Sequence, residues 1–185
     1  DLNGWEPLTD EALEVVNGSE ALLLTGGPAV NTRMRPVVYA LREDLDDIKV
    51  PITTFGVGWR SPDGRWSRTK QFGFNEASGQ LLERIRAGGL KASVRDFHTQ
   101  NVLARAGVTQ AVMTGCPALY SIDHLGKPLD ASTRIERVTV SLGVHFARSG
   151  SLAAQAKELV GTARDAFPAA ELVVAFHHSL DGRYA

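Results

Sequence analysis

The feature that most constrains the fold of this chain is a series of short, continuous apolar runs, most of them rich in β-branched residues. Six such runs recur: Ala21–Thr25, Ile52–Phe55, Lys91–Val94, Gln110–Thr114, Val138–Leu142 and Leu172–Phe176. Their apolar character is continuous rather than alternating, which is typical of strands buried on both faces of a parallel sheet. The sequence therefore predicts a parallel α/β sheet and not an antiparallel meander.

Helix signals separate these runs. Asp96 has the position of an N-cap, with Gly107 as the stop of the same helix, and Ser151 opens a later helix that Pro168 closes. The predicted helices cover Asp10–Val16, Asn75–Ala87, Phe97–Ala106 and Leu152–Phe167. The alternating order of strands and helices predicts a doubly wound α/β fold.

A polar stretch divides the chain. Between Leu119 and Arg137 there is no apolar periodicity, so we predict a partial N-terminal Rossmann-like domain over 1–120, a linker over 121–137 and the start of a second Rossmann-like domain over 138–185. Two strands and one helix are too few for an independent core. Because the chain also opens on Asp1 without an initiating Met, we expect it to be incomplete at both ends.

Composition excludes several classes of protein. The 185 residues are 43% apolar with a net charge of −1, which provides no basic field for nucleic acid. No apolar run approaches the roughly 20 residues that cross a bilayer. The single cysteine, Cys116, fits a reducing compartment, and no spaced set of metal ligands such as HExxH occurs. These features predict a cytoplasmic protein without a metal.

Ligands of open parallel sheets bind beyond the carboxyl ends of the strands, so the residues that follow each run are the candidates for a site. Gly26 and Gly27 follow the first run, where their backbone N–H groups could approach an anion, although a tight turn explains them equally well. Arg95 follows the third run and could bind a carboxylate or phosphate bidentately. Its alternative role is an ion pair with Asp96 or another carboxylate.

Further candidates follow other runs. Trp59 and Arg60 could stack on a sugar or clamp an anion, or could belong to an exposed loop. His145, His177 and His178 follow the fifth and sixth runs, where an imidazole could transfer a proton near neutral pH or could simply be solvated.

Several of these motifs occur together in one known family. The run VRD at 94–96 is followed by the step GV at 107–108 and the turn GCPA at 115–118. Upstream, the segment LLLTGGP at 22–28 is an apolar strand that ends in a pair of glycines. With VTVSLG at 138–143, this order resembles the polysaccharide pyruvyltransferase family. The resemblance runs over most of the chain.

The resemblance implies a GT-B-like fold with two Rossmann-like domains that face a cleft. It also implies transfer of the enolpyruvyl-derived group of phosphoenolpyruvate to a sugar of a surface polysaccharide or its lipid-linked precursor, which forms a pyruvate ketal. The family's donor-binding arginine maps to Arg95, and we predict that Gly26, Gly27, Trp59, Arg60, Arg95 and His178 bind substrates. The resemblance implies that the acid is the His of the family's R-x-H element, which is absent from this sequence, so His145 or His177 is the candidate local substitute. The N-x-G-D element is also missing.

The expected partners are therefore phosphoenolpyruvate and a glycan acceptor, without a cofactor, in the cytoplasm or peripherally at the inner face of the membrane. Two alternatives stay open at this point. One is a glycosyltransferase of the same fold that uses a nucleotide sugar, and the other is a noncatalytic domain that binds a glycan or a protein partner.

Overall fold

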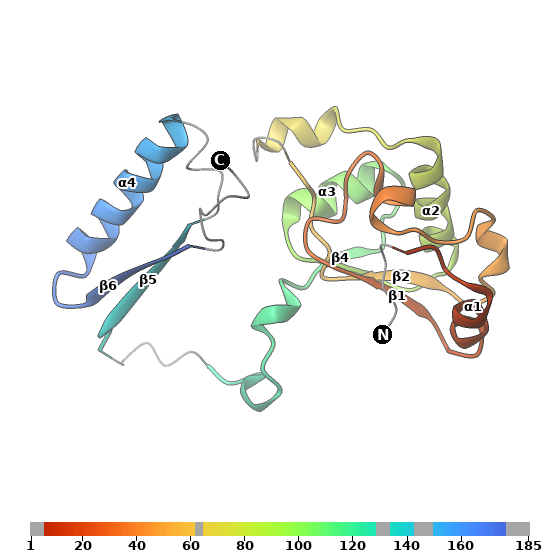
Figure 1. Ribbon diagram of the computed structural model, residues 1–185, viewed down its shortest axis with the longest axis horizontal. Helices are drawn as coiled ribbons and strands as arrows, with labels where there is room; N and C mark the ends of the chain where they lie inside the picture. Colours follow the sequence, from red (N-terminus) through yellow and green to blue (C-terminus); the bar gives the residue numbers. More distant parts are fainter. Residues whose placement is uncertain (1–5, 62–64, 129–133, 143–149, 177–185) are drawn as a thin grey trace. The chain divides into compact units, whose positions relative to one another are not determined.

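The chain forms two compact units in the computed structural model, Asp1–Leu125 and Gly126–Ala185 (Figure 1). The structure describes residues 6–61, 65–128, 134–142 and 150–176. The division between the units lies within the range 121–137 that the sequence indicates as a linker.

Four short parallel strands form the sheet of the first unit. Strand β1 (Leu22–Thr25) pairs in parallel with β2 (Ile52–Phe55), and β3 (Ala92–Val94) pairs in parallel with β4 (Ala111–Met113). A parallel bridge between Val57 and Val94 joins the two pairs, so that the strands follow one another in chain order. The predicted parallel α/β arrangement is confirmed.

Helices α1 (Asp10–Asn17), α2 (Glu76–Ala87) and α3 (Phe97–Arg105) lie where the sequence predicts them. Polar side chains cap their first turns: Asn75 accepts a hydrogen bond from the amide of Ser78 at 3.0 Å in α2. Short 3-10 or π turns occupy Met34–Val38, Leu45–Asp47, Trp66–Lys70, Pro117–Leu119 and Ile122–His124.

The core of the first unit lies between the sheet and the helices α2 and α3 (Figure 1). Both helices connect successive parallel strands: α2 lies between β2 and β3 in the chain, and α3 lies between β3 and β4. The sequence predicts burial on both faces, and this is wrong for β1, where Leu23 is exposed, whereas β2 buries the consecutive residues 52–54. Leu23 points to the opposite face from the buried Leu24. Phe55, at the end of β2, is partly exposed beside the ring of Tyr120, with ring centroids 6.3 Å apart.

The described residues of the second unit form a βαβ element. Strands β5 (Arg137–Leu142) and β6 (Glu171–Phe176) pair in parallel, and helix α4 (Gly150–Ala166) connects them. Val140 is buried, whereas the described residues of α4 contain no buried side chain. Among the described residues there is no helix long and apolar enough to cross a membrane.

Candidate functional site

The loops that follow β1 and β2 are joined by backbone hydrogen bonds at the carboxyl edge of the sheet. The amide of Gly58 donates to the carbonyl oxygen of Gly27 at 2.8 Å, and the amide of Val30 donates to the carbonyl oxygen of Gly58 at 2.9 Å. The amide of Arg95 donates to the carbonyl oxygen of Val57 at 2.9 Å. These bonds bring Gly27, Gly58 and Arg95 together at one edge, from segments that are far apart in the sequence.

The guanidinium of Arg95 occupies the space above Gly58 that a side chain would need. A Cβ atom added to Gly58 would lie 2.0 Å from Nε of Arg95 and 2.4 Å from its Cζ. A Cβ atom added to Gly27 would lie 3.8 Å from Nη1 of Arg95, an ordinary contact distance. Gly58 therefore has a specific function, since it leaves room for the arginine side chain.

Arg95 is a cation with few protein partners. Its side chain is 33% exposed, and its Nε lies 3.6 Å from Oδ2 of Asp96, which is a long contact for an ion pair. In the part of the chain that the structure describes, the guanidinium makes no hydrogen bond. The ion pair with Asp96 that the sequence allows is thus present but loose, and the guanidinium keeps donors for an anionic ligand.

Asp96 works as the predicted helix cap. Its Oδ1 accepts hydrogen bonds from the amide of Thr99 at 2.7 Å and from the hydroxyl of Thr99 at 2.8 Å. The same hydroxyl oxygen accepts a hydrogen bond from the amide of Trp59 at 2.6 Å. This network attaches the loop after β2 to the first turn of α3, and it holds Gly58 under Arg95.

Tyr39 supports the glycine pair that follows β1. Its hydroxyl donates a hydrogen bond to the carbonyl oxygen of Thr25 at 2.7 Å, and an added Cβ at Gly26 would lie 3.9 Å from that hydroxyl. Burial raises the pKa of the Tyr39 phenol well above its usual value, so the group is a neutral donor at physiological pH. Gly26 has φ of 126°, a conformation that favours glycine. Sequence reasoning missed Tyr39, which no motif singles out.

Trp59 does not have the exposed position that a sugar-stacking residue needs. Its side chain is 6% exposed, and its ring packs against Phe72, with centroids 5.4 Å apart, and against His98, with centroids 6.5 Å apart and nearly parallel planes. The parallel bridge between Val30 and Trp59 continues the sheet beyond β2 and turns the indole inward. The expectation that Trp59 stacks on a sugar from an exposed loop is therefore wrong. Arg60 is exposed, as the expectation of an exposed loop requires.

An aromatic residue that the sequence reasoning did not select is exposed beside this edge. Trp66 is 49% exposed, and its ring contacts that of His98 edge to face at a centroid distance of 4.9 Å. His98 lies in the first turn of α3, three residues after Arg95, which precedes the helix. That spacing was the signal available in the sequence.

The three histidines proposed from the sequence, His145, His177 and His178, lie outside the described residues. The structure therefore says nothing about how they relate to Arg95. Within the described residues no group of three or more His, Cys, Asp and Glu is placed to hold a metal ion.

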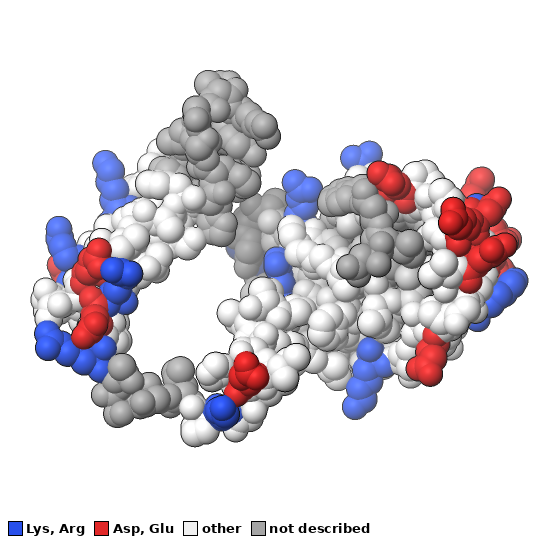
Figure 2. Space-filling model, turned by 60° about the horizontal axis from the view of Figure 1, so that its bottom comes forward, with Lys and Arg blue, Asp and Glu red and all other residues white. Residues whose placement is uncertain are grey.

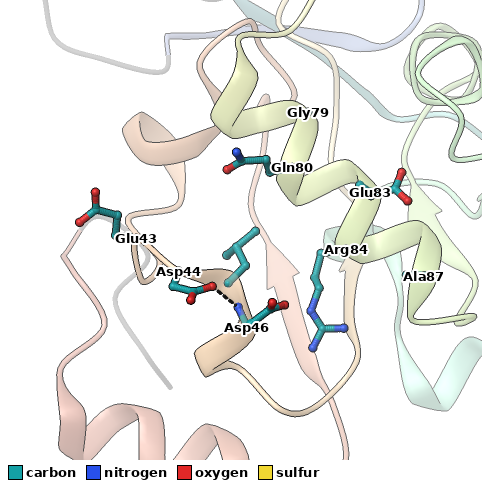
Figure 3. A pocket seen from close by; sticks show the side chains of 9 residues that line it. Glu43, Asp44, Asp46, Gly79, Gln80, Glu83, Arg84 and Ala87 are labelled. Carbon is teal, nitrogen blue, oxygen red and sulfur yellow. Dashed lines mark hydrogen bonds between the residues drawn. The ribbon is translucent and has the colours of Figure 1, made fainter.

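A separate hollow of about 670 Å³ lies between α2 and the segment Glu43–Asp46. Figure 3 shows the carboxylates of Asp46 and Glu83 and the side chain of Arg84 around it. Acidic side chains also gather at one end of the first unit in Figure 2. Four of the nine lining residues are acidic, namely Glu43, Asp44, Asp46 and Glu83, so this hollow repels anions and is a poor site for a phosphorylated substrate.

Comparison with known proteins gives this edge a chemical context. A family model described as polysaccharide pyruvyl transferase matches residues 9–179. The chain belongs to the polysaccharide pyruvyl transferase family. The match includes Gly27, Gly58 and Arg95 as well as the βαβ element of the second unit, and it makes the chain a transferase. Neither the curated proteins nor the solved structures gave a match, so the GT-B-like arrangement of two domains stays a prediction.

Proposed function

We propose that this pyruvyl transferase uses phosphoenolpyruvate as its donor and forms a pyruvate ketal on a sugar of a surface polysaccharide or its lipid-linked precursor. The observation that carries the proposal is the position of Arg95. Its guanidinium lies on the backbone of Gly58 at the carboxyl edge of a parallel sheet, where ligands of such folds bind, and it makes no hydrogen bond within the described part of the chain.

Charge complementarity links this position to the donor. Phosphoenolpyruvate carries a carboxylate and a phosphate, and a planar guanidinium can bind either group through two parallel hydrogen bonds. The contact of Arg95 with Asp96 is long and is made through Nε, so a bound anion can compete with it. The half-buried position of Arg95 also strengthens its attraction for an anion relative to a fully solvated cation.

The proposed chemistry has two steps. A general acid donates a proton to the methylene carbon of the donor, and a sugar hydroxyl adds to the adjacent carbon that carries the phosphate oxygen. A second hydroxyl of the same sugar then displaces inorganic phosphate, which closes the ketal. Arg95 would hold the anionic donor during both steps, and His145 or His177 stays the proposed acid.

One observation argues against a nucleotide-sugar donor at this edge. A helix N-terminus that binds a diphosphate must present free N–H groups and positive potential. Here the carboxylate of Asp96 accepts the hydrogen bond from the amide of Thr99 at the N-terminus of α3, so this first-turn donor is already used. We further propose that the enzyme needs no cofactor and works in the cytoplasm or peripherally at the inner face of the membrane, where a lipid-linked acceptor would be available.

The test is a pair of substitutions at Arg95. Replacement by alanine should weaken phosphoenolpyruvate binding in isothermal titration calorimetry by roughly one to two powers of ten, because a charged hydrogen bond is worth about 1.5–3 kcal/mol. Arg95→Lys should recover part of that affinity, since an ammonium keeps the charge and loses the planar fork. A normal affinity in folded Arg95→Ala, or binding of a nucleotide sugar without phosphoenolpyruvate binding, would contradict the proposal.

A further inference from the structure

Trp66 begins a 3-10 turn, Trp66–Lys70, that lies against α3. Nearly half of its side-chain surface is exposed, whereas Trp59, seven positions earlier, is buried. A half-exposed indole provides a flat apolar surface with a polar N–H edge, on which the apolar face of a ligand can stack.

The turn that carries Trp66 is held firmly on α3. The amide nitrogen Nδ2 of Asn101 donates a hydrogen bond to Oγ1 of Thr69 at 2.5 Å, and this hydroxyl donates to the carbonyl oxygen of Trp66 at 2.7 Å. Thr69 is fully buried, so these bonds are shielded from water. His98, one turn before Asn101, supports the indole of Trp66 from the same face of α3. The exposed ring therefore has a fixed position before any ligand arrives.

A continuous series of contacts connects Trp66 to the arginine corner. The ring of Trp66 contacts His98, and the ring of His98 stacks on Trp59. Trp59 directly follows Gly58, on which the guanidinium of Arg95 lies. Arg95 directly precedes Asp96, the N-cap of α3, and His98 lies in the first turn of that helix, so Trp66 is positioned near the edge where the donor is proposed to bind.

We propose that Trp66 forms the acceptor subsite, where the ring of a pyranose sugar stacks on the exposed indole. This inference rests on the proposed function and extends it to the acceptor. One face of many pyranoses consists of C–H groups and is apolar, so it packs on an aromatic ring, while the hydroxyls at its rim stay free to react. The sequence assigned sugar stacking to Trp59. The structure assigns it to Trp66, because Trp59 is buried and its ring contacts Phe72 and His98.

The experiment measures sugar and donor binding separately on the same 185-residue chain. The methyl pyranosides of glucose, galactose and mannose are titrated in saturation-transfer difference NMR, which detects weak binding, and phosphoenolpyruvate is titrated calorimetrically. For the sugars that bind, Trp66→Ala should raise the dissociation constant by about tenfold, the effect of losing ~1.4 kcal/mol of contact. Trp66→Phe should keep most of the affinity, since it retains a ring. Phosphoenolpyruvate should bind both variants normally.

Phe167→Ala is the matched control. Phe167 is also a partly exposed aromatic residue, but it follows α4 and precedes β6, so it lies at the amino edge of its sheet. Sugar binding should not change in this variant. Unchanged sugar affinity in Trp66→Ala, or no binding of any of the three sugars to the wild-type chain, overturns the acceptor subsite. Failure of the wild-type chain to bind phosphoenolpyruvate would instead contradict the proposed donor, and the sugar titrations would still decide on Trp66.

Discussion

At the scale of single residues, the candidate site depends on Gly58, which has no side chain. Gly58 leaves open the space into which the guanidinium of Arg95 folds, and an added methyl group would collide with Nε at 2.0 Å. The colliding atoms belong to the far end of a flexible side chain, so they can move at little cost. A substitution at Gly58 can therefore relocate the arginine without unfolding the protein.

Gly58→Ala should weaken phosphoenolpyruvate binding by about tenfold while the free energy of unfolding changes by less than about 1 kcal/mol. The reason is that Ala displaces the guanidinium from its place above the backbone. Calorimetric titration and urea unfolding of the same variant measure the two quantities. Gly73→Ala is the control, because an added Cβ meets no atom within 4 Å there. A Gly58→Ala protein with wild-type donor affinity would show that the position of Arg95 is irrelevant to binding.

At the scale of secondary-structure elements, glycines have opposite roles in helices and in the loops at the sheet edge. Gly79 lies inside α2, where an added Cβ meets no atom within 4 Å. Gly56 follows β2 with φ of 63°, and an added Cβ would lie 2.2 Å from the ring of Pro117. The helix does not need a glycine at position 79, whereas the loop after β2 needs one at position 56.

The same chemical change should therefore have opposite effects at these two positions. Gly79→Ala should raise the free energy of unfolding by about 0.5–1 kcal/mol, because alanine is the better helix former and restricts the unfolded chain. Gly56→Ala should lower it by at least about 1 kcal/mol, because the residue is strained and a rigid proline ring stands in the way. Urea unfolding measures both changes, and a loss of stability in Gly79→Ala would mean that the space beside Gly79 in α2 is not open.

At the scale of the whole molecule, the two units differ in the apolar surface that they bury. The first unit has a core that includes fully buried residues from strands and helices, such as Ile52, Leu81 and Val94. Among the described residues of the second unit, Val140 is the buried hydrophobic one. Local stability depends on such burial, so the units should open to solvent with different free energies.

Hydrogen–deuterium exchange of the 185-residue chain should show this difference. Backbone amides of α4 should exchange at least about tenfold faster than those of α2, whose inner face contacts the core. The two helices provide each other's control, since both carry intrahelical hydrogen bonds and differ in burial. Equal protection of α2 and α4 would show that the second unit has a stabilising partner surface that the described residues do not reveal.

The sequence by itself determined the elements and their order. All six strands and all four helices were predicted within one or two residues at each end, and Asp96 was identified as the cap of α3. These features depend on interactions between residues close in the chain, such as caps, helix stops and the apolar pattern of a strand. The same local reasoning placed Arg95 at the carboxyl end of β3.

Tertiary structure alone decided which side chains of the edge are available to a ligand. Trp59 is buried because its amide bonds to Thr99, 40 residues later, and its ring meets Phe72 and His98. The guanidinium of Arg95 lies where it does because Gly58, in the loop after β2, leaves space for it. Trp66 is held in an exposed position because its turn is attached to α3 by the hydrogen bond between Asn101 and Thr69, which are 32 residues apart. Local sequence patterns do not predict such contacts, because the contacts form only when distant segments meet in the folded chain.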